Sequence, residues 1–343
     1  MAIGARSHHH HGARMSQLRL DPLTGRWVVV SHQRAERPQA FLPPMLPVEE
    51  EPGRPCPFCL GNEEATPPAL ETYGDDGGWM VRVVPNLYPA FEGTGSMVVS
   101  HVGPVFTQAP ARGLHEVLVL SPDHRLTWAD LPDHQAHLVM EAIRDRARTH
   151  ASLLGLRYSL AIVNQGREAG ASIEHPHGQL LGIPFVPREI TDELVGFARF
   201  EGRCLICTVA GAEEEAQSRI VDADDHSLVV CPFWSGTPYE MLILPRAHRP
   251  LLHEADDADL ASVGRATRTA LALLRRHVGE VPYNVVFHSA PHGTTGTYHW
   301  HVHILPKLTT RAGFELGTGV WTNVVAPERA AEDLRAAVLA GEP

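Results

Sequence analysis

The sequence contains no apolar run that approaches the roughly 20 residues of a membrane-spanning helix, and no pattern typical of a signal peptide. Its first residues, Met1 to Arg14, hold four consecutive histidines among small and polar residues, which is typical of an expression tag, so we take the native chain to start near Met15. These absences predict a soluble, cytoplasmic protein with no membrane partner.

Cysteine and positive charge are also scarce. Five cysteines are too few for a disulfide framework, and four of them form two CxxC pairs, Cys56/Cys59 and Cys204/Cys207, which in a cytoplasmic chain favour metal sites over disulfides. The formal net charge of −11 disfavours contact with a nucleic-acid backbone, so no nucleic-acid partner is expected. The roughly 330 native residues are enough for two domains.

Two segments of the chain repeat each other at an offset of 124 residues, from His124 to His248. HEVLVLSPDH (115–124) and YEMLILPRAH (239–248) each contain an acidic residue, four consecutive apolar residues and a closing histidine. Both are typical of a buried strand that runs into a loop. The same offset places HPHGQ (175–179) over HWHVH (299–303). Because a CxxC pair precedes each match, we infer two copies of one fold.

The repeat predicts the domain organisation. The tag (1–14) precedes an N-terminal domain at 15–198, and a C-terminal domain with a C-terminal extension follows at 199–343. Apolar residues recur at helical spacing in 134–154 and in 257–278, one helix in each copy. We therefore predict an α+β fold made of two tandem domains, each with a mainly antiparallel sheet and helices.

The CxxC pairs and the repeated histidines predict two zinc sites. A structural zinc ion takes four Cys or His ligands in a tetrahedron, and CxxC supplies two of them. The repeat nominates His124 and His175 for the first site, with Cys56 and Cys59, and His248 and His299 for the second, with Cys204 and Cys207. Scattered histidines are more often buried or solvent-exposed than metal ligands, but the same four-ligand pattern in register twice favours metal.

In an extended strand His175, His177 and Gln179 point to the same side. If His175 binds zinc, His177 is free, and it follows a loop of small residues, GREAGAS (166–172), whose backbone N–H groups can approach a phosphate. A neutral imidazole there is placed to attack phosphorus and form a covalent nucleotidyl-histidine. Gln179 can donate to phosphoryl oxygens without activating water, so the motif favours transfer over hydrolysis.

These motifs resemble the histidine-triad superfamily, and within it the galactose-1-phosphate uridylyltransferase family, which has two such repeats and the HPHGQ signature. The resemblance covers nearly the whole native chain. It includes DPLTGRWVVVSHQRAERP near the N-terminus, CPFC, the asparagine of VVPNLYPAF, SPDH and HVHILP.

The resemblance implies two histidine-triad (HIT-like) domains, a homodimer and a ping-pong reaction. A histidine takes a nucleoside monophosphate from a nucleotide sugar and passes it to a sugar 1-phosphate. By matching motifs, His177 is the nucleophile and Gln179 its phosphoryl partner. The residues expected to contact nucleotide or phosphate are Arg34, Arg37, Asn86, Asn164, Gly170 and Ser172.

The C-terminal segment departs from the family pattern. Family members use a lysine, and a tyrosine followed by a glutamate, to hold the hexose phosphate, whereas AGFELGTGVWTN (312–323) has neither lysine nor tyrosine. This segment is more similar to the related ADP-glucose phosphorylases, which use the same nucleophile with phosphate as acceptor. The alternative function is therefore a phosphorylase of nucleotide sugars or dinucleotides.

The second metal is a further open point. Some family members bind iron through a glutamate and three histidines, and Glu193, His288, His301 and His303 match those positions. Because Cys204 and Cys207 are intact, zinc at the CxxC set is the preferred prediction. A two-zinc binding module without catalysis is the rival from another class, and the HPHGQ loop argues against it.

Overall fold

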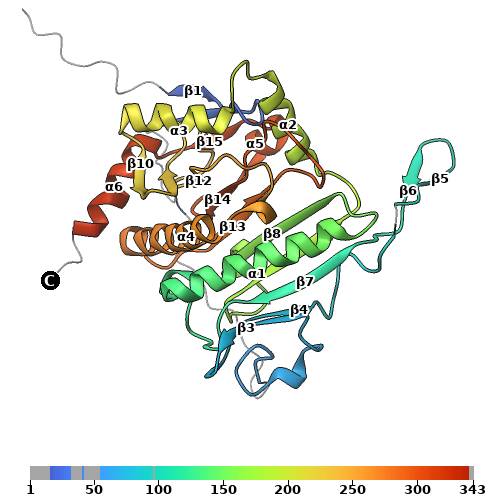
Figure 1. Ribbon diagram of the computed structural model, residues 1–343. Coiled ribbons are helices and arrows are strands. Elements are labelled where there is room, and N and C mark those ends of the chain that lie inside the picture. Colours follow the sequence, from blue (N-terminus) through green and yellow to red (C-terminus); the bar gives the residue numbers. More distant parts are fainter. Residues whose placement is uncertain (1–15, 32–40, 42–54, 96, 340–343) are drawn as a thin grey trace, which may run out of the picture.

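The structure is a computed structural model that describes residues 16–31, 41, 55–95 and 97–339. Its centre is one sheet of ten strands (Figure 1). They are β3 (Glu71–Asp75), β4 (Gly78–Pro85), β7 (Leu114–Val119), β8 (Tyr158–Gln165), β9 (His177–Ile183), β10 (Ile220–Ala223), β11 (Ser227–Val230), β12 (Met241–Pro245), β13 (Tyr283–His288) and β14 (His301–Pro306). All neighbouring pairs are antiparallel, in the order β10-β11-β12-β14-β13-β8-β9-β7-β4-β3.

The other elements surround this sheet. The helices are α1 (Asp133–Ser152), α2 (Arg188–Arg199), α3 (Leu205–Ala216), α4 (Asp257–Val278), α5 (Gly313–Thr318) and α6 (Pro327–Leu339), with short 3₁₀ helices η2 (Glu63–Ala65), η3 (Trp128–Asp130), η4 (Arg167–Ala169) and η5 (Leu252–Glu254). The remaining strands are β1 (Gln17–Leu20), β2 (Trp27–Val30) and β15 (Trp321–Asn323), which form a three-stranded sheet, and β5 (Ser100–Val102) and β6 (Phe106–Gln108), which form a hairpin. The mixed α+β architecture and its antiparallel sheet confirm the predicted fold class.

The elements repeat at the offset found in the sequence. Helix α4 begins 124 residues after α1, β14 begins 124 residues after β9, and η5 lies 124 residues after η3. The two halves meet where β8 pairs with β13, with Asn164 opposite Asn284, so one sheet runs through both of them. The predicted division at residues 198 and 199 falls at the end of α2 and stays a prediction.

Helices α1 and α4 lie side by side on one face of the sheet (Figure 1). Their contact is close because α4 has a glycine where the helices meet: a Cβ on Gly264 would lie 2.7 Å from the carbonyl oxygen of Ala136. Trp128, fully buried, donates from its indole N–H to the Gly264 carbonyl at 3.3 Å. Apolar side chains of both halves therefore form a single core beneath these helices.

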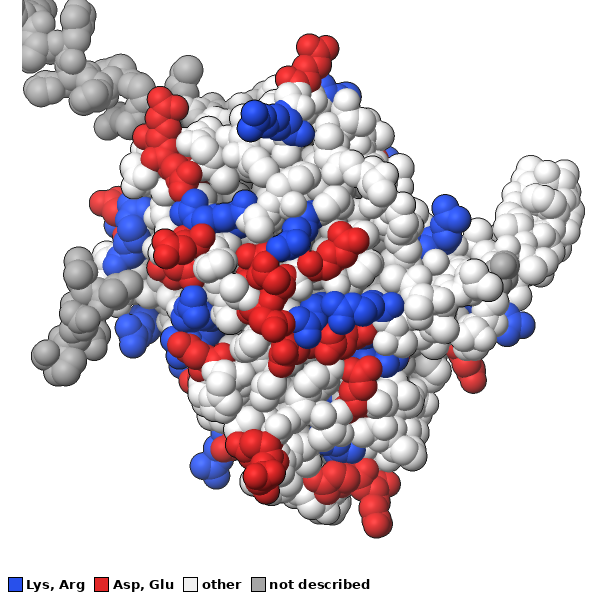
Figure 2. Space-filling model, viewed as in Figure 1, with Lys and Arg blue, Asp and Glu red and all other residues white. Residues whose placement is uncertain are grey.

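The β5–β6 hairpin extends away from the body of the protein (Figure 1). No Asp, Glu, Lys or Arg occurs between Gly93 and Ala111, and the hairpin carries neither colour in Figure 2, although charges of both signs lie on the body. Several of its apolar side chains are exposed, among them Val105 at 75% and Phe106 at 67%. No helix of the described residues is long and apolar enough to cross a membrane.

Candidate active site

Four side chains from three separated segments form the first Cys/His cluster. Cys56 and Cys59 flank a turn, His124 follows β7, and His175 precedes β9. The Nδ1 atoms of His124 and His175 are 3.3 Å apart, and the Cys59 Sγ lies 3.4 Å and 3.6 Å from them. Tetrahedral zinc with ordinary bond lengths places neighbouring ligand atoms about 3.3–3.8 Å apart. The four ligand atoms, all within 4.8 Å of one another, thus fit zinc.

A backbone contact orients His175 for this role. Its Nε2 donates to the carbonyl oxygen of Ser121 at 2.7 Å, which leaves the Nδ1 lone pair directed at the cluster. Burial lowers the pKa of His175 to about 4, so the ring is neutral at physiological pH. A neutral imidazole is the form that binds a metal.

The second cluster repeats this arrangement. The Nδ1 of His299 lies 3.4 Å from the Cys207 Sγ and 3.6 Å from the Cys204 Sγ, and the Nδ1 of His248 lies 3.8 Å from Cys207. Hydrogen bonds from Cys207 and His299 lower the pKa of the Cys204 thiol, which favours the thiolate form that binds zinc. The geometry of this set also fits zinc.

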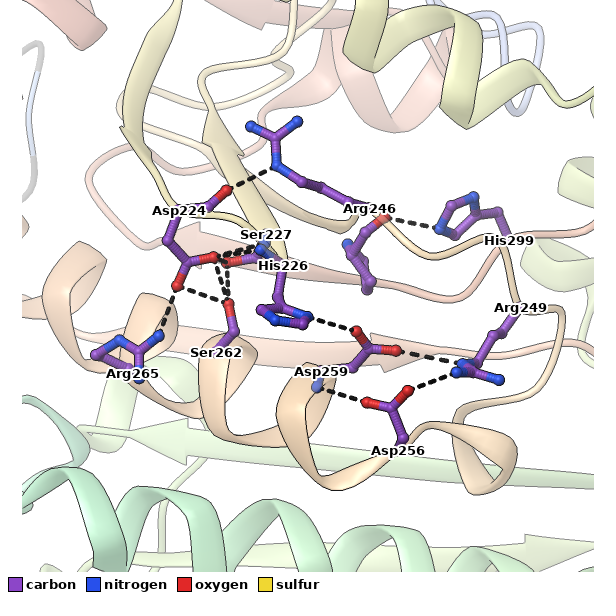
Figure 3. A network of polar contacts seen from close by, with 11 residues as sticks. Asp224, His226, Ser227, Arg246, Arg249, Asp256, Asp259, Ser262, Arg265 and His299 are labelled. Atoms are coloured by element: carbon purple, nitrogen blue, oxygen red, sulfur yellow. Dashed lines mark hydrogen bonds and ion pairs between the residues drawn. The ribbon is translucent and has the colours of Figure 1, made fainter.

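Polar contacts with helix α4 hold the end of β12, where the Pro245 carbonyl contacts His299 (Figure 3). The His299 Nε2 donates to the Pro245 carbonyl at 2.9 Å, and the next residue, Arg246, donates to the Asp224 carbonyl at 2.7 Å. The Asp224 carboxylate accepts from Ser262 at 2.7 Å and from Arg265 at 2.6 Å, both on α4. The strands that carry the second cluster are thereby fixed to the main helix of their half.

The alternative metal set is Glu193, His288, His301 and His303, and hydrogen bonds connect its members. Glu193 accepts from His288 Nδ1 at 2.7 Å, which is a hydrogen-bond distance, and its second oxygen accepts from the buried Tyr298 hydroxyl at 2.5 Å. Burial alone would raise the pKa of Glu193, but His288 and His301 lower it well below its usual value. Glu193 also raises the pKa of His288 against the effect of burial. Glu193 and His288 thus form a buried charged pair, and because all four ligand atoms of the set lie within 4.8 Å of one another, the set could also hold a metal ion.

His177 begins β9 and lines a cavity. Its Nδ1 donates to the His175 carbonyl at 2.8 Å, which leaves Nε2 as the unprotonated nitrogen of the neutral ring. Burial lowers the pKa of His177, so the neutral form predominates at pH 7. The ring packs against Phe58, whose centroid is 5.4 Å away. His177 therefore presents an unprotonated ring nitrogen at a fixed position.

The cavity beside His177 has a volume of about 590 Å³, within the usual range for a small-molecule site. Three further residues expected to act here from the sequence, Asn86, Ser172 and Gln179, line it. The described part of its wall contains no lysine or arginine. Arg34 and Arg37 fall outside the described residues.

Asn164 and Gly170 do not line this cavity. The Asn164 Oδ1 accepts from Asn284 at 2.7 Å, and Asn284 also donates to the Ala169 carbonyl at 2.8 Å, so this pair fixes the loop beside Ser172. Gly170 ends η4 with φ +95°, a left-handed conformation that favours glycine. These two residues shape the loop rather than the cavity wall.

The sequence analysis did not identify three residues that contact the HPHGQ motif from other segments. Phe58 packs on both motif histidines, Ser121 orients His175, and His115 contacts Gln179 through its Nε2 at 2.8 Å. The sequence alone does not reveal the His115 contact, because it depends on the pairing of β7 with β9, in which Val117, two residues from His115, lies opposite Gln179. Residues two apart in a strand lie on the same face.

The residue of the C-terminal half that corresponds to His177 is His301, and its surroundings differ. The Nδ1 of His301 donates to the His299 carbonyl at 2.8 Å, as in the first half, but its Nε2 lies 3.7 Å from Glu193 and is fully buried. The corresponding cavity, of about 260 Å³, is lined by residues of the β1–β2 segment and by Trp321 of β15. His301 does not line this cavity, whereas His177 lines the cavity of the first half.

Comparisons with known proteins agree with this geometry. The family model of the galactose-1-phosphate uridyl transferase N-terminal domain matches residues 7–187, and that of the C-terminal domain matches residues 191–337. ADP-glucose phosphorylase of Arabidopsis thaliana is 30% identical, with 93% of this chain and 92% of the relative covered. Galactose-1-phosphate uridylyltransferase of Thermotoga maritima is also 30% identical, with 94% and 98% covered.

Solved structures give the same result. The Arabidopsis thaliana ADP-glucose phosphorylase with bound ADP-glucose superposes with a TM-score of 0.79 at 29% identity, covering 94% of this chain and 99% of that one. A uridylyltransferase structure has a TM-score of 0.74 at 30% identity, with 95% and 99% covered. The chain is therefore an enzyme of the galactose-1-phosphate uridylyltransferase family.

Proposed function

We propose that the protein is a nucleotidyltransferase of the hexose-1-phosphate uridylyltransferase type that works through a nucleotidyl-His177 intermediate. The observation that carries this proposal is the 2.8 Å hydrogen bond from His177 Nδ1 to the His175 carbonyl, with Nε2 left for the cavity that Gln179 also lines. A fixed, neutral imidazole is a competent nucleophile toward phosphorus.

The first half-reaction follows from this geometry. The Nε2 lone pair attacks the α-phosphorus of a nucleoside diphosphate sugar, the N–P bond forms, and the bond from phosphorus to the bridging oxygen breaks. Sugar 1-phosphate leaves with the bonding electrons, while the Nδ1 proton stays hydrogen-bonded to the His175 carbonyl, which stabilises the positive charge that develops on the ring. The second half-reaction reverses these steps with another phosphate oxygen as nucleophile.

Gln179 and Asn86 are proposed to donate to the phosphoryl oxygens. Both carry amide groups in the cavity wall, and neither amide can act as a base toward water. The diphosphate charge needs cations that the described wall lacks. Arg34 and Arg37 therefore remain our candidates for it, since guanidinium binds phosphate in a bidentate manner.

The acceptor has two candidates. Relatives named galactose-1-phosphate uridylyltransferase favour a hexose 1-phosphate as acceptor, and the relative named ADP-glucose phosphorylase favours inorganic phosphate. The departure at residues 312–323, which form α5 and β15 here, favours the second. We keep transfer to a sugar 1-phosphate as the main proposal and phosphorolysis of an ADP-glucose-like substrate as the alternative.

We propose two structural zinc ions, one at each CxxC cluster. The first would hold His175, and with it the start of β9, in place; it takes part in no chemical step. The set around Glu193 is the alternative position for iron. It shares no residue with the second CxxC cluster, so occupation of one does not exclude the other.

A homodimer in the cytoplasm completes the proposal. The exposed, uncharged β5–β6 hairpin supports self-association, because a two-stranded hairpin is only marginally stable by itself. Reduced cysteines at two metal sites fit a cytoplasmic location. Light scattering at several protein concentrations would test the dimer.

Trapping the intermediate tests the function. The protein is incubated with UDP-glucose or ADP-glucose carrying ³²P at the α-position, denatured, and digested for mass spectrometry. We expect label on the peptide that contains His177, none in His177→Ala, and wild-type labelling in His134→Ala, which changes an exposed histidine of α1. Galactose 1-phosphate or phosphate is then added to discharge the label. Wild-type labelling that survives in His177→Ala would refute the mechanism, and a wild-type protein that takes no label would instead favour the two-zinc module.

A further inference from the structure

We propose that His115 is a positioning residue that fixes which end of the Gln179 amide faces the cavity. This inference rests on the proposed function, because the orientation of the amide affects the rate only if a phosphoryl group is transferred beside it. The contacts that carry it are a chain of two hydrogen bonds, from the Ala90 backbone to His115 and from His115 to Gln179.

The two side chains lie on neighbouring strands and on the same face of the sheet. His115 pairs with Leu181 across β7 and β9, and Val117 pairs with Gln179, so His115 and Gln179 are diagonal neighbours. The His115 Nε2 lies 2.8 Å from the Gln179 Oε1. Long side chains at this diagonal spacing can meet directly.

A backbone group determines the tautomer of His115. The Ala90 N–H donates to the His115 Nδ1 at 3.0 Å, and a backbone amide can only donate. The Nδ1 therefore has no proton, and the neutral ring carries its proton on Nε2. It follows that Nε2–H donates to the Gln179 oxygen and that the Gln179 –NH₂ group points away from His115.

The orientation has a chemical consequence. The two ends of an amide have almost the same shape, so the shape of a site cannot select between them. With the nitrogen toward the cavity, Gln179 donates to a phosphoryl oxygen beside His177. With the amide reversed, its oxygen would face that anion and repel it. The hydrogen bond from His115 to the Gln179 oxygen excludes the second orientation.

Asn86 provides an internal comparison. Its Oδ1 accepts from the Tyr88 backbone N–H at 2.9 Å, so a backbone group sets its orientation. The Asn86 Nδ2 lies 3.2 Å from the His115 Nε2. With the tautomer derived above both atoms are donors, so neither accepts a hydrogen bond from the other and Gln179 is the acceptor for the His115 Nε2–H. Loss of His115 should therefore affect Gln179 and leave the orientation of Asn86 unchanged.

A double-mutant cycle tests the proposal. Formation of labelled nucleotidyl-enzyme is followed in single turnovers for wild type, His115→Ala, Gln179→Ala and the double variant, with His134→Ala as the control. Loss of a positioned donor typically slows such a step about 100-fold, so we expect that for Gln179→Ala and about 10-fold for His115→Ala. The double variant should be no slower than Gln179→Ala. His115→Gln, which keeps a donor, should recover part of the rate.

The substrate concentration that gives half-maximal labelling should change little in His115→Ala, because the lost contact acts on the transition state. A wild-type labelling rate in His115→Ala would overturn the proposal, and so would a full additional 10-fold loss in the Gln179→Ala background. One readout is independent of activity: ¹⁵N NMR of His115 should report a proton on Nε2 and none on Nδ1. The opposite tautomer refutes positioning, whereas the expected tautomer in a protein that takes no label refutes the proposed function alone.

Discussion

The glycine of HPHGQ allows β9 to lie close to β8, and its replacement by alanine is the perturbation that tests this most directly. An added Cβ on Gly178 would lie 2.8 Å from the Ile162 carbonyl oxygen and 3.1 Å from a Val163 methyl group. The first neighbour is backbone and cannot rotate away, so the two strands must separate by a few tenths of an ångström. Overpacking of this kind costs about 1–3 kcal/mol. The substitution adds no backbone strain, because the φ of Gly178 is not positive.

The displaced segment carries His177 and Gln179 on either side of the substitution. Misplacement of reacting groups by about 1 Å costs roughly 100-fold in rate, so a shift of a few tenths predicts a loss of up to about 10-fold in single-turnover labelling. Urea unfolding measures the stability, with Gly211→Ala as the matched control. Gly211 lies in α3 with no atom within 4 Å of an added Cβ, and alanine there should stabilise the helix by up to about 1 kcal/mol. Wild-type stability and labelling in Gly178→Ala would refute the argument.

Three further outcomes are expected. Hydrogen bonds, led by that from Ser262, outweigh burial and lower the pKa of Asp224 below its usual value, so the folded protein stabilises the carboxylate. Asp224→Asn should therefore reduce the free energy of unfolding, measured in urea, by about 1–3 kcal/mol. An unchanged urea midpoint would contradict this. Burial lowers the pKa of His292 to about 4, so between about pH 6.5 and pH 4 the unfolded chain binds a proton that the folded chain does not, and stability falls as the pH falls through that window. Because the side chain is partly exposed, the loss should stay near 2 kcal/mol or less, and His292→Gln should flatten the pH dependence of the urea midpoint. Elemental analysis should find about two zinc ions per chain, with one lost in Cys56→Ser and the other in Cys204→Ser. A chelator should lower the melting temperature. Full metal content in either variant would exclude its cluster as a zinc site.

The sequence predicts those parts of this fold that repeat. An offset of 124 residues sufficed to align α1 with α4 and β9 with β14, because helical and strand periodicity are local properties of the chain. The same register nominated both Cys/His sets, and the structure brings each of them together. Local patterns of apolar and ligand residues carry this information without knowledge of strand order.

Contacts between segments far apart in the chain could not be predicted from these local patterns. Pairing of β8 with β13 joins segments about 120 residues apart, and parallel pairing of β15 with β2 joins segments nearly 300 residues apart. No motif specifies either pairing. The orientation of His115 depends on a backbone N–H of Ala90, and the bonds of Glu193 depend on Tyr298, whose position relative to α2 follows only from the completed fold.

The continuous sheet makes the two halves of the polypeptide dependent on each other. If the chain were cut between α2 and α3, each fragment would expose the strand that now bonds to the opposite half, with its unpaired N–H and C=O groups turned to solvent. Such fragments are expected to aggregate when expressed singly and to reassemble when expressed together. An insertion at that connection interrupts no strand pairing, which makes it a suitable position for a split reporter of this enzyme.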